Sequence, residues 1–437
     1  MPQLIEQRAG PCKPNMEIFL LLCGNFFFDF IDVAFVYGHS DCSHYKNNST
    51  VDMQESDVGN EYPGIVFFSG GTALNGLAAH IADLNPACSY IITTFDSGGS
   101  SANLRDVFDM PAVGDVRNRL IALADTSSPE RANIVKMLST RLPKVADRPA
   151  LQSQLSHLAN GSHPLMEGLS EVVRKILADR FSFFVDLVDD NFDPSYASLG
   201  NIVLAAGFMA HQRVLAPPIA QFSRLINARA VVRSSTVDNG HLAVRLQNGE
   251  IIAGQHLFTG KEVDPIPSPI DGMWICSGVN DPWPRLVHAS SLAMRLVSDA
   301  DMIVYPMGSF YSSILAAVSP QGMGRTISLN PCPKLFIPNM GNDPELIGHS
   351  VDLQVERLLE VLRMDNGAGI KPENVLNAIL IDSENGDYAG RLNLKELEKL
   401  PLKVIDRKLV SDESEVLIDA GLLASELMEL ACGNEFK

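Results

Sequence analysis

The chain contains few cysteines, and none of them forms a recognisable pair. The seven occur at Cys12, Cys23, Cys42, Cys88, Cys276, Cys332 and Cys432. No CxxC pair and no His/Cys spacing of a zinc site is present, which argues against a zinc module or a disulfide framework. Scattered free thiols are typical of a reducing compartment, so we expect a cytoplasmic protein.

Basic residues are also clearly fewer than acidic residues. Lys and Arg total 34 against 52 Asp and Glu, and the formal net charge is −18 over 437 residues. Strongly acidic proteins are poor non-specific partners for DNA, RNA or anionic membranes. We therefore expect no nucleic-acid partner and no membrane partner, although single cations can still hold phosphate groups.

No uninterrupted apolar run of membrane-spanning length is present. Residues 18–37 are very apolar, but Asn25, Asp29 and Asp32 interrupt them. A span needs about 20 apolar residues, and a carboxylate within it is costly. We expect residues 1–62 to form a poorly ordered extension without a structural role. A targeting or anchoring segment and a part of the fold are the alternatives.

Neither a Walker A lysine nor a complete G-x-G-x-x-G motif is found, yet two glycine turns occur close together. The apolar run Ile65–Phe68 precedes Ser69-Gly70-Gly71-Thr72, and Tyr90–Phe95 precedes Asp96-Ser97-Gly98-Gly99-Ser100-Ser101. Each turn leads into a predicted helix. A strand, a glycine turn and a helix together present backbone N–H groups to an anion. Two such turns indicate a phosphate-bearing ligand.

The rest of the chain alternates between predicted strands and helices. Hydrophobic residues make up 46%, which fits a large core. From residue 63 we predict one α/β domain with a Rossmann-like, doubly wound, mainly parallel sheet. A helical insertion is expected near 142–195. A small antiparallel insertion is expected at 229–258, where Asn239-Gly240 and Asn248-Gly249 indicate hairpins. Residues 265–284 are predicted to be a loop.

The two glycine turns supply the first candidate site residues. We expect Gly70, Gly71 and Thr72 to hold a phosphate, with a purely structural turn as the alternative. Asp96 follows a predicted strand, where a carboxylate can bind Mg²⁺ or act on a substrate hydroxyl. The alternative for Asp96 is a helix cap. Further candidate ligand-binding residues in the second turn are Gly98, Gly99, Ser100 and Ser101.

Three further clusters complete the candidate site. Asp115 is a second candidate catalytic residue, and helix capping is its alternative. Arg117 and Asn118 follow it. An arginine near glycine turns suits bidentate phosphate contact, with a surface ion pair as the alternative. The remaining candidates lie at two predicted helix starts: Gly200, Asn201, Gly308, Ser309 and Tyr311.

Taken in order, these motifs resemble the CofD-like family. The segments SGGT, FDSGGSSANLR, PAVGDVRNRLIALAD, LGNIVLAA and YPMGSFYSSIL carry the resemblance, which extends from Gly64 to the C-terminus. The family includes 2-phospho-L-lactate transferase and the YvcK-like gluconeogenesis factors. The residue sequence of these motifs is most similar to that of the CofD-related proteins of the bacterial GAK system.

The resemblance implies a nucleotide or nucleotide-sugar ligand bound across the glycine turns. It implies either a Mg²⁺-assisted transferase of a phosphate-containing group or a non-catalytic UDP-sugar-binding regulator. Two positions depart from the family pattern: Ser97 replaces a second aspartate and Ala73 replaces a glycine. A dinucleotide oxidoreductase is a weaker alternative, and a homodimer is left open.

Overall fold

The computed structural model describes residues 62–189, 192–433 and 435. All of them belong to the compact unit Gly59–Lys437. The predictions made for residues 1–61 lie outside the described residues.

A seven-stranded parallel sheet forms the centre of this unit. Its order is β11-β10-β9-β8-β1-β2-β3, and every neighbouring pair runs parallel. The strands are β1 (Ile65–Ser69), β2 (Ser89–Ile92), β3 (Val231–Ser234), β8 (Met302–Tyr305), β9 (Lys334–Phe336), β10 (Ala378–Ile381) and β11 (Lys403–Asp406). Strands β1, β2, β8, β9 and β10 are entirely buried. Continuous apolar strands fit a sheet covered on both faces, so the predicted fold class is confirmed.

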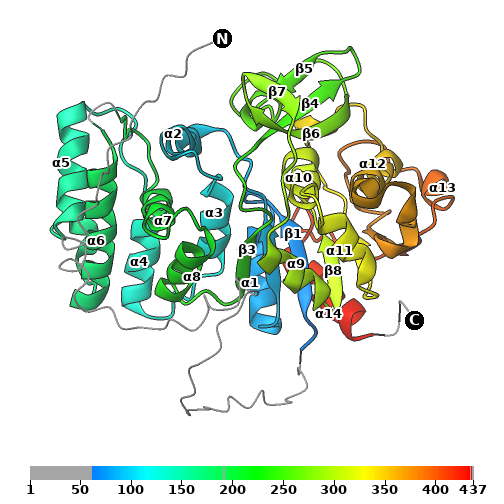
Figure 1. Cartoon of the computed structure of the whole chain (residues 1–437). Helices are drawn as coiled ribbons and strands as arrows, with labels where there is room; N and C mark the ends of the chain where they lie inside the picture. The colour runs from blue at the N-terminus through cyan, green and yellow to red at the C-terminus, as the bar shows by residue number, and fades with distance from the viewer. Residues whose placement is uncertain (1–61, 190–191, 434, 436–437) are drawn as a thin grey trace, which may run out of the picture. The chain divides into compact units, whose positions relative to one another are not determined.

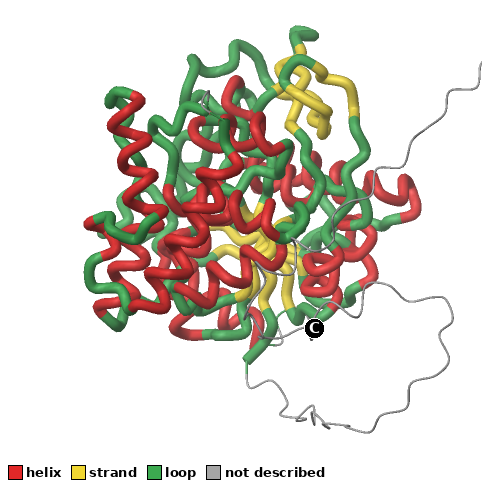
Figure 2. Tube along the Cα trace, turned by 60° about the vertical axis from the view of Figure 1, so that its left-hand side comes forward, coloured by secondary structure: helices red, strands yellow, loops and turns green. Residues whose placement is uncertain are grey.

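Helices lie on both sides of the sheet (Figures 1 and 2). One group is joined by contacts of α1 with both α3 and α14, and another by contacts of α11 with both α9 and α12. Their bounds are α1 (Asn75–Leu84), α3 (Gly114–Ala122), α14 (Ala420–Cys432), α9 (Ser291–Ser298), α11 (Met323–Leu329) and α12 (Val351–Arg363). The sheet order reverses between β1 and β8, which makes their shared carboxyl edge the topological switch point.

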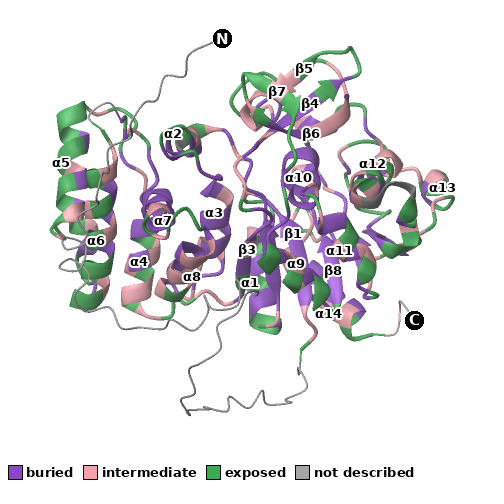
Figure 3. Ribbon diagram, in the orientation of Figure 1, coloured by how far each residue is buried: buried purple, intermediate pink, exposed green. Residues whose placement is uncertain are grey.

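A long helical crossover connects β2 to β3. Besides α3 it contains α2 (Gly99–Phe108), α4 (Pro129–Ser139), α5 (Arg148–Ala159), α6 (Glu171–Leu187), α7 (Leu199–Ala210) and α8 (Ala216–Leu225). Helix α4 begins at Pro129, and the Ser128 hydroxyl accepts a hydrogen bond from the N–H of Arg131. Figure 3 shows that α5 and α6 expose much of their surface, whereas α7 is buried along most of its length. The predicted helical insertion corresponds to α5 and α6.

The antiparallel sheet begins later and ends later than the sequence indicated. It has the order β5-β4-β6-β7. Its strands are β4 (His241–Leu246), β5 (Ile251–Ala253), β6 (Ile270–Gly278) and β7 (Asp281–Pro284). Asn248-Gly249 joins β4 to β5 as a hairpin, as predicted. Asn239-Gly240 is not a hairpin turn, because β3 pairs with β2 in the parallel sheet. The predicted loop 265–284 contains β6 and β7.

Some elements were missed because they are short or have mixed composition. Strands β9 and β11 and helix α12 were not predicted. The helix predicted to start near Gly308 begins as a π-helix, Phe310–Leu315, and continues as α10 (Ala316–Val318). Short segments complete the unit: α13 (Leu394–Leu397) and the 3₁₀ turns Pro164–Met166, Gln255–Leu257, Pro344–Leu346, Met364–Gly369 and Pro372–Asn374. Within the described ranges, no helix has the length and apolarity needed to cross a bilayer.

Candidate functional site

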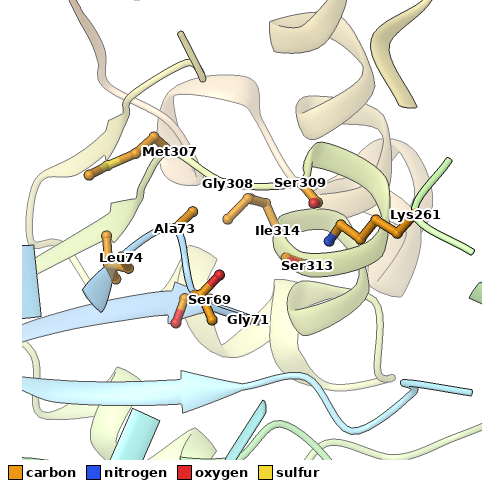
Figure 4. Close-up of a pocket in the computed structure, with 12 residues that line it drawn as sticks. Ser69, Gly71, Ala73, Leu74, Lys261, Met307, Gly308, Ser309, Ser313 and Ile314 are labelled. Carbon is orange, nitrogen blue, oxygen red and sulfur yellow. The ribbon is translucent and has the colours of Figure 1, made fainter. Parts of the chain in front are cut away.

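A crevice opens at the switch point, where β1 and β8 end side by side. Its cavity volume is about 120 Å³. The lining residues come from the first glycine turn, the segment after β8 and one distant loop: Ser69, Gly70, Gly71, Thr72, Ala73, Leu74, Met307, Gly308, Ser309, Ser313, Ile314 and Lys261. Figure 4 shows these groups surrounding the opening. The crevice therefore contains the predicted Gly70, Gly71, Thr72, Gly308 and Ser309.

Asp115 connects this crevice with the second glycine turn. A Cβ added to Gly70 would lie 3.1 Å from Asp115 Oδ2, and one added to Gly71 would lie 3.6 Å from Asp115 Oδ1. Asp115 is the second residue of α3, and the capping position is Val113. Helix capping, the alternative raised from the sequence, is therefore not its role.

Three predicted side chains meet at Gly114, directly before Asp115. A Cβ there would lie 2.8 Å from Ser101 Oγ, 3.3 Å from Asp96 Oδ2 and 4.0 Å from Asn201 Nδ2. Asp96 Oδ1 accepts a hydrogen bond of 3.0 Å from the N–H of Gly98, ahead of α2, and no side chain caps that helix. The other oxygen, Oδ2, is the one directed toward Gly114, which places the Asp96 carboxylate beside Asp115.

The two carboxylates influence each other electrostatically. Burial and then the charge of Asp96 raise the pKa of Asp115 to about 7, although Lys261, Arg119 and Arg117 oppose the shift. Desolvation and a like charge both disfavour ionisation of a carboxylate. A carboxyl group that titrates near neutral pH in a crevice is characteristic of functional sites.

Lys261 is the functional candidate that the sequence did not reveal. It lies in the loop between β5 and β6, is exposed, and directs its ammonium group into the crevice in Figure 4. Its charge lowers the pKa of Asp115, Asp343 and Glu345. No motif surrounds Lys261 in the sequence, so only the tertiary contact between the antiparallel sheet and the crevice identifies it. Ser313, four residues after Ser309, was detectable from helical spacing.

Three backbone N–H groups at the helix start after β8 are bonded to the protein's own carboxylates. Asp343 Oδ2 accepts from the N–H of Phe310 at 3.2 Å. Glu345 Oε2 accepts from the N–H groups of Tyr311 and Ser312 at 2.9 and 2.8 Å, and Oε1 accepts from the Ser312 hydroxyl. Burial and the neighbouring Asp343 raise the pKa of Glu345 to about 7. The N–H groups of residues 310–312 are therefore already occupied, whereas the predicted Gly308 and Ser309, just before them, line the crevice.

Several predicted ligand-binding residues are not among those that line the crevice. Tyr311 is buried, and its hydroxyl bonds to His349 Nε2 at 2.6 Å. Arg117 is buried against α7, where it donates to the hydroxyl of Ser198 and to Asn118 Oδ1. A Cβ on Gly200 would lie 2.7 Å from Arg117 Cδ, so this glycine allows helix packing. Tyr311, Arg117, Asn118 and Gly200 therefore have contacts within the protein, and their expected ligand contact stays a prediction.

Arg119 lies beneath the first glycine turn. It is fully buried, donates to the carbonyl of Gly71 at 3.4 Å and lies 5.2 Å from the centroid of the Tyr90 ring. The buried hydroxyls of Ser69, Thr93 and Thr94 find no hydrogen-bond partner within the described part of the chain. Buried hydroxyls are normally bonded, and their concentration at the carboxyl ends of β1 and β2 favours a polar ligand there.

Arg105 on α2 connects the second glycine turn to the residues just before the antiparallel sheet. Arg105, almost fully buried, donates to the carbonyls of Phe95 and Asp96 at 3.3 and 2.8 Å. Its other nitrogen donates to Asn239 Oδ1 at 2.7 Å and to the carbonyl of Gly240. One guanidinium therefore joins the turn to the entry of β4. A Cβ added to Gly99, whose φ is +52°, would have no other group within 4 Å; the side chain of Ser100 is not described.

We expect Arg105→Met to destabilise the fold by about 2 to 4 kcal/mol, because several charge-assisted hydrogen bonds are lost and buried carbonyls are left unpaired. Urea unfolding followed by circular dichroism measures this. Arg295→Met is the matched control, since Arg295 is 83% exposed, and its effect should stay within about 0.5 kcal/mol. Equal unfolding midpoints for the two variants would contradict the bridging role of Arg105.

Comparison with known proteins gives matches over most of the chain. The family model described as "2-phospho-L-lactate transferase CofD" matches residues 65–417. The gluconeogenesis factor of Bacillus subtilis is 23% identical over 398 residues, covering 84% of this chain and 98% of that protein. An uncharacterized protein of Saccharomyces cerevisiae is 26% identical over 209 residues, covering 44% of each chain.

A solved structure shares the fold. The crystal structure of a UPF0052 family member from Bacillus halodurans has a TM-score of 0.62 and 19% identity, and the match covers 85% of this chain and all of that one. At this level of identity the likeness concerns the fold alone.

Proposed function

Because this chain belongs to the CofD family, we propose that it binds a nucleotide or nucleotide-sugar and transfers a phosphate-containing group from it to an acceptor hydroxyl, with a nucleoside monophosphate as the leaving group. The observation that carries the proposal is the position of Asp115 beside the first glycine turn, with Asp96 close enough for its charge to raise the pKa of Asp115. Helix and strand ends at a switch point suit a phosphate. Lys261 supplies the cation that faces it.

Mg²⁺ fits the pair of carboxylates. Mg²⁺ is usually held by one or two carboxylates together with substrate phosphates and water. The described residues contain no group of three or more His, Cys, Asp or Glu side chains arranged to hold a metal. Asp96 and Asp115 would therefore hold the ion jointly with the ligand's phosphate. When bound, the ion would neutralise charge on the phosphate oxygens.

The chain's own residues have distinct roles in this proposal. The backbone of Gly70, Gly71 and Thr72 approaches the phosphate closely, and the Lys261 ammonium faces it from the opposite side. Ser101 and Asn201 lie around Gly114 together with Asp96, and in this proposal they bind ligand hydroxyls. Asp96 also accepts hydrogen bonds from an acceptor hydroxyl and orients it. Stabilisation is thus mainly electrostatic.

A second candidate is a non-catalytic regulator that binds a UDP-sugar. The match to the Bacillus subtilis gluconeogenesis factor over 98% of that protein favours it. Both candidates use the same crevice, so binding alone does not separate them. Turnover of the nucleotide-sugar does.

We expect binding of UDP-glucose or GDP to require Mg²⁺ and to weaken at least about tenfold in EDTA, since two carboxylates would otherwise repel the phosphates. Isothermal titration calorimetry with and without MgCl₂ measures this, and ³¹P NMR of the same mixture plus candidate acceptors follows turnover. If the protein binds nucleotide-sugars but converts none of them, the result supports the non-catalytic regulator. Equal affinity in EDTA contradicts the metal-assisted site.

A further inference from the structure

The loop that carries Lys261 is fixed at its base. Residues 254–262, called the strap here, connect β5 to the long segment before β6. The N–H of Gly254 donates to the carbonyl of Leu242 on β4 at 2.7 Å. Phe258 and Thr259 are buried in the middle of the strap. The strap is therefore part of the packed unit.

On one side of the crevice the strap is bonded to the second glycine turn. Ser97, almost fully buried, has its Oγ 2.8 Å from His256 Nδ1, and it accepts a second hydrogen bond from the N–H of His256 at 3.4 Å. A Cβ on Gly98 would overlap Glu262 Oε1 and lie 3.4 Å from His256 Cβ. This glycine thus allows the strap to lie directly on the turn.

On the other side the strap contacts the segment that caps the helix after β8. Gly260 has a φ of +65°, and a Cβ on it would lie 2.9 Å from Pro344 Cβ. Pro344 stands between the capping residues Asp343 and Glu345. Lys261 follows Gly260 immediately and faces the crevice between these two contacts.

We propose that the strap is a phosphate-positioning element and that Ser97 and His256 are the residues that hold it in place. The Ser97–His256 contact places the ammonium of Lys261 over the crevice, where it binds the ligand's phosphate. This proposal rests on the proposed phosphate-bearing ligand and adds the element that orients it. Lysine is a flexible point charge, so a fixed backbone on both sides limits the positions its ammonium can reach.

The first experiment measures binding of UDP-glucose with Mg²⁺ by isothermal titration calorimetry. Ser97→Ala and His256→Gln remove the contact between the Ser97 and His256 side chains. Each should weaken binding about tenfold, which corresponds to losing the charge-assisted interaction between Lys261 and the phosphate. His256→Asn keeps a polar group near the Nδ1 position and should stay close to the wild type. Ser97→Ala combined with Lys261→Ala should bind no more weakly than Lys261→Ala alone, because Ser97 acts through Lys261. Additive losses overturn the proposal.

The second experiment needs no ligand. Hydrogen exchange of the full chain should be faster at residues 254–262 in Ser97→Ala than in the wild type, and unchanged in Ser153→Ala, an exposed control on α5. Unchanged exchange at 254–262 overturns the anchoring role, whatever the ligand. If exchange rises while the wild type binds neither UDP-glucose nor inorganic pyrophosphate, the proposed function and the Lys261 contact both fail.

Discussion

Replacing Asp115 with asparagine is expected to abolish Mg²⁺-dependent nucleotide binding while stabilising the fold at pH 8. The affinity loss should reach about 100-fold or more, because the carboxylate is one of two proposed metal ligands. The stability gain follows from burial and from Asp96, which raise the pKa of Asp115 to about 7 in the folded state. A residue whose removal stabilises the fold and removes function is the signature of a strained site.

The sign of the pH dependence follows from proton linkage. Between the unfolded pKa of 3.8 and the folded value of about 7, the folded state binds more protons than the unfolded state. Stability from this group therefore falls as pH rises through that window. Asp115→Asn lacks this loss, so its Tm should exceed the wild-type value by about 2 to 4 °C at pH 8. The two should agree near pH 4.

Asp382→Asn provides the matched control with the opposite sign. Burial acts to raise the pKa of Asp382. Hydrogen bonds from the N–H groups of Leu409, Asn385 and Val410 outweigh this effect and hold the pKa below its usual value. A lowered pKa contributes stability above the unfolded pKa and loses it on acidification. Asp382→Asn should therefore lower Tm at pH 8. If Asp115→Asn lowers Tm as well, Asp115 is a structural residue and its assignment to the site is wrong.

Gly70→Ala is expected to close the crevice. A Cβ on Gly70 would lie 2.7 Å from Ser313 Cβ, a separation that no packed pair of side chains adopts. The segment after β8 must move away from β1, which costs about 1 to 3 kcal/mol as overpacking. Binding of UDP-glucose should fall at least about tenfold, because the backbone that approaches the phosphate is displaced. Calorimetry and thermal unfolding measure the two effects.

Neighbouring substitutions distinguish this steric effect from a general loss of fold. Gly71→Ala meets only Asp115 Oδ1, at an ordinary 3.6 Å, so its Tm should match the wild type. Adding Ser313→Gly to Gly70→Ala removes the overlapping atoms and should restore most of the lost Tm. A Gly70→Ala protein that keeps both Tm and affinity would show that β1 and β8 do not form the binding crevice.

Much of the fold was predictable because local patterns encode it. The runs that became β1 and β2 are mostly apolar, and a strand, a glycine turn and a helix in succession are typical of a parallel α/β sheet. Strands β9 and β11 were missed because three or four residues of mixed polarity carry no period. The hairpin predicted at Asn239-Gly240 was wrong because a hairpin signal is local, whereas β3 pairs with β2, from which the whole helical crossover separates it in the sequence.

The sequence by itself determined the carboxylates and glycines of the candidate site. Residue type and position after a strand singled out Gly70 and Asp96, and a position at a predicted helix start singled out Asp115. Only the tertiary structure decided which candidates face the crevice, because the direction of a side chain depends on what packs against it. It turned Tyr311 toward His349 and brought Lys261 from the antiparallel sheet to the crevice, contacts between segments that no local pattern connects.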